Sequence, residues 1–295
     1  MGLFQVKESV QARGNFRIVS LTMTNEELPE AFDGYSFVQV SDLHLGLCTK
    51  FSQIAQAFEH AQALRPDLLL ITGDLIQYGG VGIRHFLATR LSPGLFRWIQ
   101  YRRKVRRLAE QLAALFAAHA PPDGIIGVYG NHEYHEGIGT IRRKLDGRII
   151  WLKNTVTQIQ RGPHQILFYG LDDFRHGRPS IKRTFQLPPE VPADNTTVCR
   201  IFLAHNPDSV LLPNADMLSG TDLVLCGHTH GGQICLPGGK PILTHTHQRH
   251  HVAGLSMFHS TPVYVSRGVG QGILPIRMFC PPEITLVTLK KGTAA

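Results

Sequence analysis

The sequence predicts an α/β protein, and three observations support this fold class. Short apolar runs alternate with segments of helical periodicity, as in chains that fold into parallel strands covered by helices. Five of the apolar runs lead directly into clusters of Asp, Asn and His. The chain has 295 residues, of which 43% are hydrophobic and 18% charged. This length supports a buried core, and the composition excludes a disordered or collagen-like protein.

Nine apolar runs are predicted as strands because they are short and bounded by turn residues. A helix is predicted over residues 51–64, ending before Pro66, since proline lacks the N–H that continues a helix. No internal repeat or linker divides the chain, so we expect a single domain over residues 1–295. The predicted strands cover residues 16–21, 35–40, 68–71, 124–129, 165–169, 200–204, 223–226, 262–266 and 284–289.

An insertion over residues 79–121 separates two of these strands. From Gly94 to Ala118 its apolar residues recur every three or four positions, which predicts an amphipathic helix. Between Leu75 and Ala109 there are eight Lys and Arg residues and no acid, which matches the whole net charge of +8. The helix either packs its apolar stripe on the core or covers a lipid site at a membrane interface. We expect it to act as a lid over the crevice at the ends of these strands, with Arg97, Trp98, Tyr101 and Arg103 contacting substrate.

The sequence shows no membrane-spanning segment, because its longest apolar run, residues 112–118, is far shorter than the roughly 20 residues required. The N-terminus matches neither a signal peptide nor a myristoylation pattern. The five cysteines form no C-x-x-C pair, which favours a reducing compartment. We expect a cytoplasmic protein, peripheral on the inner membrane surface through the basic insertion.

The polar clusters after the strands predict a metal site. The carboxyl ends of strands in an α/β sheet are where ligands bind, so five such clusters can converge on one crevice. The donor set contains imidazole and oxygen but no thiolate, which suits Mn, Fe or Zn. Seven ligands exceed the needs of one ion, so we expect two divalent ions about 4 Å apart, bridged by Asp74. The candidate ligands are Asp42, His44, Asp74, Asn131, His205, His228 and His230.

These motifs resemble the five signatures of the calcineurin-like metallophosphoesterases. The resemblance implies a four-layer α-β-β-α sandwich that holds two metal ions, with Mn expected and Fe or Zn as alternatives. It implies that His132 is the catalytic histidine and does not bind metal. The matching motifs are Asp42-x-His44, Gly73-Asp74, Gly130-Asn131-His132-Glu133, His205 and Gly227-His228-Thr229-His230. By the same resemblance, Asp42, His44, Asp74 and His230 hold one ion, and Asp74, Asn131, His205 and His228 hold the other.

Further motifs resemble a bacterial branch of this family that includes a UDP-diacylglucosamine pyrophosphohydrolase of lipid A synthesis. They are His205-Asn206-Pro207-Asp208, Gly231-Gly232-Gln233-Ile234, Ser266-Arg267-Gly268-Val269-Gly270, Pro275-Ile276-Arg277 and Pro281-Pro282-Glu283-Ile284. The implied reaction converts UDP-2,3-diacylglucosamine to UMP and 2,3-diacylglucosamine 1-phosphate (lipid X). Its partners are then a lipid-linked nucleotide and a membrane surface, and nucleic acid is not expected. The basic insertion is longer than in simpler relatives.

Several residues near these motifs have two interpretations. His132 is expected to donate a proton to the leaving oxygen, with Asp42 as its orienting partner. A second histidine cluster either contacts phosphate or a third metal, or forms a partly exposed loop. Arg267 either holds a phosphate oxygen or braces its loop, whereas Asp172 and Asp173 are expected to form a structural turn. The second cluster comprises His245, His247, His250 and His251.

Two alternative functions remain open from the sequence. A nuclease or general phosphodiesterase would use the basic segment to bind a nucleic-acid backbone. A metal-binding scaffold without turnover would need no proton donor, and the presence of His132 argues against it. Oligomeric state does not follow from the sequence.

Overall fold

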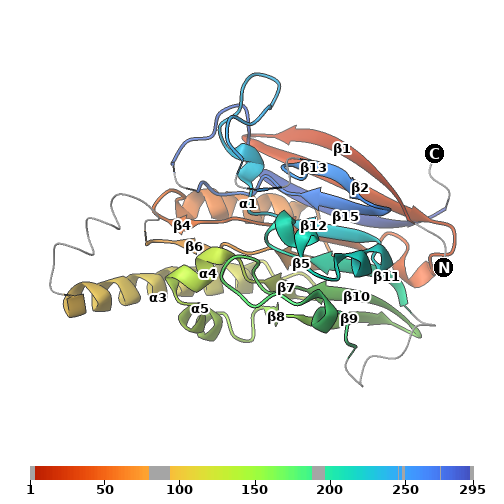
Figure 1. The fold of residues 1–295 in the computed structure, drawn as a ribbon, viewed down its shortest axis with the longest axis horizontal. Coiled ribbons are helices and arrows are strands. Elements are labelled where there is room, and N and C mark those ends of the chain that lie inside the picture. Colours follow the sequence, from red (N-terminus) through yellow and green to blue (C-terminus); the bar gives the residue numbers. More distant parts are fainter. Residues whose placement is uncertain are drawn as a thin grey trace.

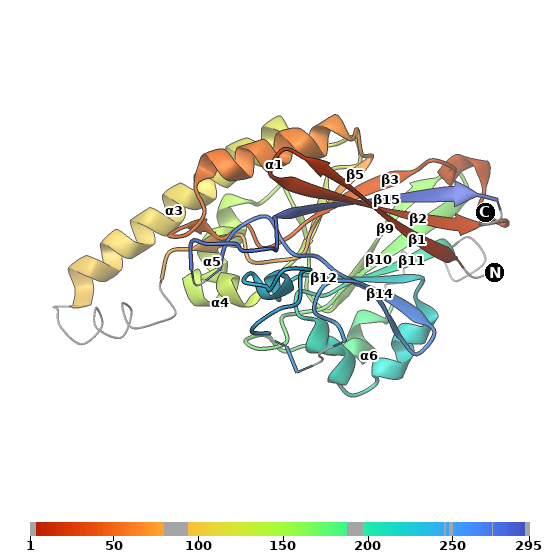
Figure 2. The same ribbon diagram turned by 90° about the horizontal axis from the view of Figure 1, so that it is seen from above.

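The computed structural model describes residues 4–79, 94–187, 197–244, 246–247, 250–272 and 274–292. Two β-sheets pack face to face, and helices cover the outer face of each (Figures 1 and 2). This arrangement confirms the predicted α/β fold and its four layers. Residues 80–93 of the predicted insertion lie outside the described part of the chain.

The first sheet has seven strands in the order β1-β2-β15-β3-β5-β7-β8. Strands β3, β5, β7 and β8 run parallel to one another, so their carboxyl ends share one edge. Strand β15 pairs parallel with β2 and antiparallel with β3. The bounds are β1 (Gln5–Arg13), β2 (Phe16–Asn25), β3 (Ser36–Val40), β5 (Leu68–Ile71), β7 (Ile125–Val128), β8 (Ile150–Leu152) and β15 (Glu283–Lys291).

The second sheet has six strands in the order β13-β14-β12-β11-β10-β9, of which β10, β11, β12 and β14 are parallel. A two-stranded sheet joins β4 (Leu45–Gly46) to β6 (Ile76–Gln77). All nine predicted strands are present. The bounds are β9 (Thr155–Arg161), β10 (His164–Gly170), β11 (Thr197–Leu203), β12 (Leu223–Cys226), β13 (Gly254–Phe258) and β14 (Thr261–Val265).

Three hydrophobic clusters lie at the three interfaces between the four layers. The cluster around Phe37, Phe168 and Tyr264 joins the two sheets. A second cluster packs the helices α1 (Phe51–Ala63) and α3 (Gly94–Ala118) on the first sheet. A third covers the second sheet. Removing this much apolar surface from water is the main term that stabilises the sandwich.

The shorter helices lie in the connections between strands, and several of them position site residues. The α-helices are α4 (Asn131–Glu136), α5 (Ile138–Lys144) and α6 (Ile181–Thr184). The 3₁₀ helices are η1 (Glu30–Phe32), η2 (Pro207–Leu211), η3 (Ala215–Gly220) and η4 (His230–Gly232). None of the helices in the described part of the chain is long and apolar enough to cross a membrane.

Helix α3 has the predicted bounds and divides into two parts. Its later turns bury Val105, Leu108 and Leu112 in the core beside α1 and β5. Its first turns project from the body of the protein (Figures 1 and 2), and Trp98 is 56% exposed. The apolar stripe is therefore used mainly for core packing, and its beginning remains at the surface.

Candidate metal centre

The seven predicted ligands meet where the carboxyl ends of strands from both sheets come together. Asp42 follows β3, Asp74 follows β5 and Asn131 follows β7, all in the first sheet. His205 and His228 follow β11 and β12 in the second sheet. His44 lies two residues after Asp42, and His230 lies two residues after His228. All seven side chains are buried.

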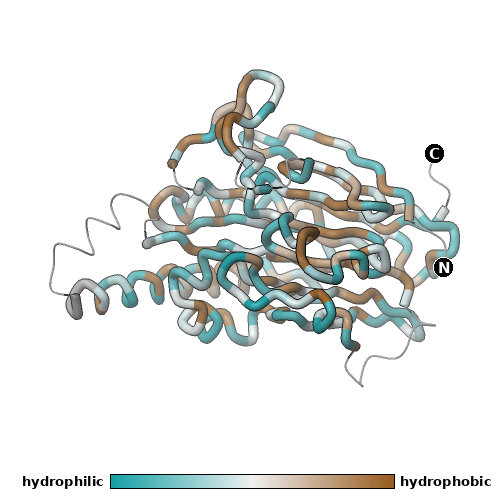
Figure 3. Tube along the Cα trace, in the orientation of Figure 1, coloured by the Kyte–Doolittle hydropathy of each residue, from teal (hydrophilic) through white to brown (hydrophobic). Residues whose placement is uncertain are grey.

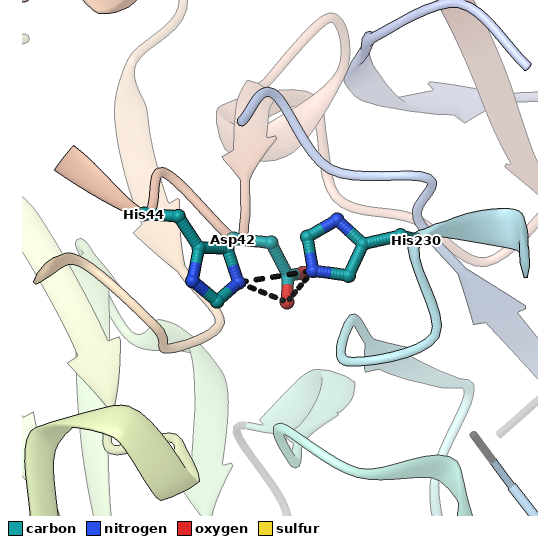
Figure 4. A group of neighbouring side chains, drawn as sticks. All are labelled: Asp42, His44 and His230. Atoms are coloured by element: carbon teal, nitrogen blue, oxygen red, sulfur yellow. Dashed lines mark hydrogen bonds and ion pairs between the residues drawn. The ribbon is translucent and has the colours of Figure 1, made fainter. Parts of the chain in front are cut away.

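One group of donors lies around Asp42 (Figure 4). His44 Nε2 is 3.8 Å from Asp42 Oδ1, and His230 Nε2 is 3.6 Å from the same oxygen. The two Nε2 atoms are 2.9 Å apart. Asp74 Oδ2 lies 3.6 Å from His44 Nε2. These four side chains therefore point donor atoms at one common point.

The second group of donors lies around His205. Its Nε2 is 3.2 Å from Asp74 Oδ2, 3.2 Å from Asn131 Oδ1 and 3.0 Å from His228 Nδ1. The other ring nitrogen, Nδ1, is 2.7 Å from the carbonyl oxygen of Thr72 and donates to it, which directs the Nε2 lone pair into the cluster. Asp74 Oδ2 faces both groups, as expected for a bridging carboxylate.

The chemistry of the cluster fits divalent cations. Burial lowers the pKa of His228 to about 3 and also lowers the pKa of His230, so these imidazoles are neutral. Burial opposes ionisation of Asp42, but His230 and His44 hold its pKa below the ordinary value. For His205, burial is outweighed by Asp74, which raises the pKa to about 10. Neutral imidazoles and ionised carboxylates are the metal-binding forms, and a cation would replace the proton on His205.

The backbone of the cluster is strained. Asp42, His44, Asp74, His228 and His230 all have positive φ, between 45° and 70°. A non-glycine residue in this left-handed region costs about 1 kcal/mol, and such strain concentrates at functional sites. The turn out of each strand thus directs its side chain back toward the other sheet.

Two glycines let the loops approach one another. A Cβ atom at Gly130 would lie 2.3 Å from Asp74 Oδ1, and one at Gly227 would lie 2.0 Å from Ser41 Oγ. Both distances are far below van der Waals contact, so any side chain here would displace Asp74 or the loop that carries Asp42. This explains why glycine precedes the ligands in both motifs.

His132 lies at the rim of the cluster, with its ring 4.7 Å from the ring of His44. Its backbone N–H donates to Asp74 Oδ1 at 2.8 Å. The expectation that Asp42 orients His132 is wrong, because Asp42 instead accepts hydrogen bonds from Ser41 Oγ and from the backbone of His228. Asp74 is the carboxylate that favours the protonated form of His132, against a larger effect of burial that lowers its pKa to about 4.

Two supporting residues were quoted in motifs but given no role by the sequence. Buried Glu133 accepts backbone hydrogen bonds from Gly130, Asp74 and Leu75 at 2.7–2.9 Å, which joins two ligand loops. Arg277 donates to the carbonyl oxygens of Gly268 and Gly270, and its Nη2 is 3.3 Å from His230 Nδ1. Arg277 therefore supports the back of a metal ligand.

The structure gives the contacts of several side chains for which the sequence offered two interpretations. Arg267 forms an ion pair with Glu283 at 2.6 Å, so it braces its loop. His247 is mostly exposed and lies 3.0 Å from Asp208, while His251 hydrogen-bonds Ser256. His250 is exposed, and His245 lies outside the described residues.

Asp172 and Asp173 belong to a turn, as expected. Asp172 accepts the backbone N–H of Arg178, and Asp173 accepts those of Arg175 and His176. These bonds position Arg175 and His176 beside the metal cluster.

The described α3 residues that were predicted to contact substrate do not line the cavity at the metal cluster. Tyr101 donates a hydrogen bond to Glu136 at the end of α4, the helix that begins with Asn131. The Arg102 guanidinium lies 5.4 Å from the ring of Trp98, and Arg103 is exposed. The side chain of Arg97 is outside the described residues. None of the α3 side chains that the structure describes lines the cavity at the metal cluster.

That cavity has a volume of about 630 Å³, within the usual range for small-molecule sites. Part of its lining is polar and includes Arg175, and another part, contributed by other loops, is apolar. The polar part contains His132, His135, Arg175 and His176. The apolar part contains Ile234, Ile242, Leu243 and Leu274.

Comparison with known proteins agrees with this geometry. The chain is 30% identical over 273 residues to the uncharacterized metallophosphoesterase YkuE of Bacillus subtilis, covering 91% of this chain and 84% of YkuE. It is 30% identical over 256 residues to the phosphodiesterase YaeI of Escherichia coli, covering 86% and 82%. It is 29% identical over 302 residues to the UDP-2,3-diacylglucosamine pyrophosphatase LpxG of Chlamydia trachomatis, covering 92% and 89%.

Residues 35–232 match the calcineurin-like phosphoesterase family. This segment contains all seven candidate ligands and His132. Members of this family typically bind two divalent metals. Candidate donor groups are present here: Asp42, His44 and His230 form one, Asp74, His205 and His228 form another, and His132 also lies close to His44 and Asp74. The chain therefore belongs to the calcineurin-like phosphoesterases and is a metal-dependent hydrolase of phosphoester bonds.

Proposed function

We propose that this protein hydrolyses the pyrophosphate bond of UDP-2,3-diacylglucosamine, releasing UMP and 2,3-diacylglucosamine 1-phosphate in lipid A synthesis. The observation that carries the proposal is the mixed lining of the cavity, which combines polar and apolar side chains. Its polar part suits a diphosphate, and its apolar part suits acyl chains. The similarity to LpxG, whose name states this substrate, supports the same choice.

Each part of the lining has a distinct task in the proposed reaction. Arg175 and His176 bind the phosphate oxygens, since cations and N–H donors offset their negative charge. His132 lies beside the leaving oxygen and donates a proton or a hydrogen bond to it. The two metal ions, for which we propose Mn, would lower the pKa of the attacking water and neutralise phosphate charge. Leu243 and Leu274 contact the acyl chains.

Helix α3 is proposed to contact the membrane rather than the reacting groups. Arg103, Lys104 and Arg107 are exposed on it, and basic residues near an anionic bilayer contribute about 1 kcal/mol each. The enzyme would then act as a peripheral protein on the cytoplasmic face of the inner membrane.

The test measures UMP release from UDP-2,3-diacylglucosamine in detergent micelles, with Mn added to metal-depleted enzyme. A chromogenic phosphodiester and single-stranded DNA serve as competing substrates. We expect faster turnover of the lipid nucleotide than of either competitor, and none after chelation. Failure to release UMP, together with active cleavage of DNA, would replace the proposal with a nuclease.

A further inference from the structure

We infer that two adjacent loops, residues 234–243 and 274–279, insert into an anionic bilayer next to the metal cavity; we call them the paired loops. Seven of their large apolar side chains are between 45% and 70% exposed. Exposed apolar residues are common singly, but a cluster marks an interaction surface. The cluster comprises Leu236, Ile242, Leu243, Leu274, Ile276, Met278 and Phe279. The inference deepens the proposed function, because a lipid substrate requires access from a membrane.

Backbone hydrogen bonds hold the paired loops together. Cys235 N–H donates to Met278 O at 2.9 Å, and Met278 N–H donates to Gln233 O at 3.0 Å. The Gln233 side chain also donates to Leu274 O at 2.8 Å. Phe279 has a φ of 50°, a strained conformation that holds its exposed side chain at the end of the second loop. The structure thus keeps these apolar side chains exposed to water, which is unfavourable in free energy.

The paired loops are continuous with the metal cavity. Ile242, Leu243 and Leu274 line it, whereas Leu236, Ile276 and Phe279 lie beyond its lining. In Figure 3 hydrophobic segments occur in these loops above the sheets as well as inside the strands. An acyl chain that leaves the bilayer here can reach the cavity along an apolar surface.

The charge of the segment that contains the paired loops favours an anionic bilayer as the partner over a protein surface that carries charges of both signs. Residues 223–282 contain no Asp or Glu, although they make up 60 residues of the chain. Lys240 lies in the turn of the first loop, where its carbonyl oxygen accepts the N–H of Leu236. This loop projects from the sheets (Figure 1). An exposed apolar loop that carries a cation can insert at the headgroup level, where anionic lipids attract the charge.

The test uses sedimentation with vesicles of phosphatidylethanolamine and phosphatidylglycerol, at low and high salt. The variant combines Leu236→Ser, Ile276→Ser and Phe279→Ser, none of which lines the cavity. The control combines Ile150→Ser, Leu211→Ser and Met257→Ser, residues of similar exposure outside the paired loops. We expect vesicle partitioning to fall about tenfold or more in the variant and little in the control, since each lost side chain removes several buried CH₂ groups.

Turnover of a soluble phosphodiester by the full chain shows whether each protein is folded and active, and it should stay unchanged in both. Vesicle binding that is absent in the wild type, or equal in variant and control, would overturn the inference. This failure differs from failure of the proposed function, which is absence of UMP release from micellar substrate. Loss of vesicle binding in the variant but not in the control would support the inference, whichever substrate the enzyme prefers.

Discussion

The metal cluster and the paired loops lie next to one another, yet their side chains are held in opposite environments. The seven candidate ligands are buried, and five of them have a backbone with positive φ. The paired loops instead hold leucine, isoleucine and phenylalanine in water. We propose that bond cleavage depends on the first region and that the second region decides which phosphoester reaches it. Changes in the cluster should therefore affect every substrate, whereas changes in the paired loops should affect lipid substrates alone.

The largest expected effect comes from Asp74→Ala. Asp74 Oδ2 faces both donor groups, so its loss should release both metal ions and abolish hydrolysis of soluble and lipid substrates alike. Elemental analysis of the purified variant measures the metal content, and circular dichroism confirms the fold. Two ions still bound per chain would contradict a bridging role for Asp74.

His132→Ala should reduce kcat about 10²-fold or more on both substrates, the usual range for a general acid. The metal content should stay at the wild-type value, because the two donor groups are complete without His132. Steady-state kinetics and elemental analysis on one preparation check this. A near-normal kcat would show that His132 has a structural role only.

A smaller and selective effect is expected from Trp98→Ala combined with Arg103→Glu on helix α3. Hydrolysis of a long-chain lipid substrate in vesicles should fall about fivefold to tenfold, since roughly 1 kcal/mol is lost per basic residue near the membrane. Hydrolysis of a soluble phosphodiester should stay unchanged. Exposed Arg148→Glu is the matched control for charge. Equal loss on both substrates would mean that α3 only supports the fold.

The smallest effect is expected from Tyr101→Phe. It removes the hydroxyl that donates to buried Glu136, so the free energy of unfolding should fall by about 1 kcal/mol. Urea denaturation measures it. Because Glu136 ends α4, which begins at Asn131, we also expect a small loss of kcat on both substrates. An unchanged midpoint of unfolding would show that the α3–α4 contact does not stabilise the protein.

Local sequence patterns were enough to predict many of the strands, the candidate ligands and helix α3. Buried strands such as β5 and β12 are short unbroken apolar runs, and the residues that follow them are the candidate ligands, so both are visible in sequence. Strand β1 was missed because most of its side chains are exposed at the sheet edge, where polar residues are tolerated. The bounds of α3 followed from its periodicity and the absence of proline, since helix formation depends on neighbouring residues.

Only the tertiary structure shows which side chains and backbone groups contact one another. The periodicity of α3 predicted an apolar stripe, but only the packing of Val105 and Leu112 showed that the core uses most of it. The donors to Asp42 are its chain neighbour Ser41 and the backbone of His228, which is 186 residues away, and only the fold reveals the second of these. The paired loops have no periodicity, and about forty residues separate Cys235 from Met278; only the sheet framework brings these two backbones within hydrogen-bonding distance.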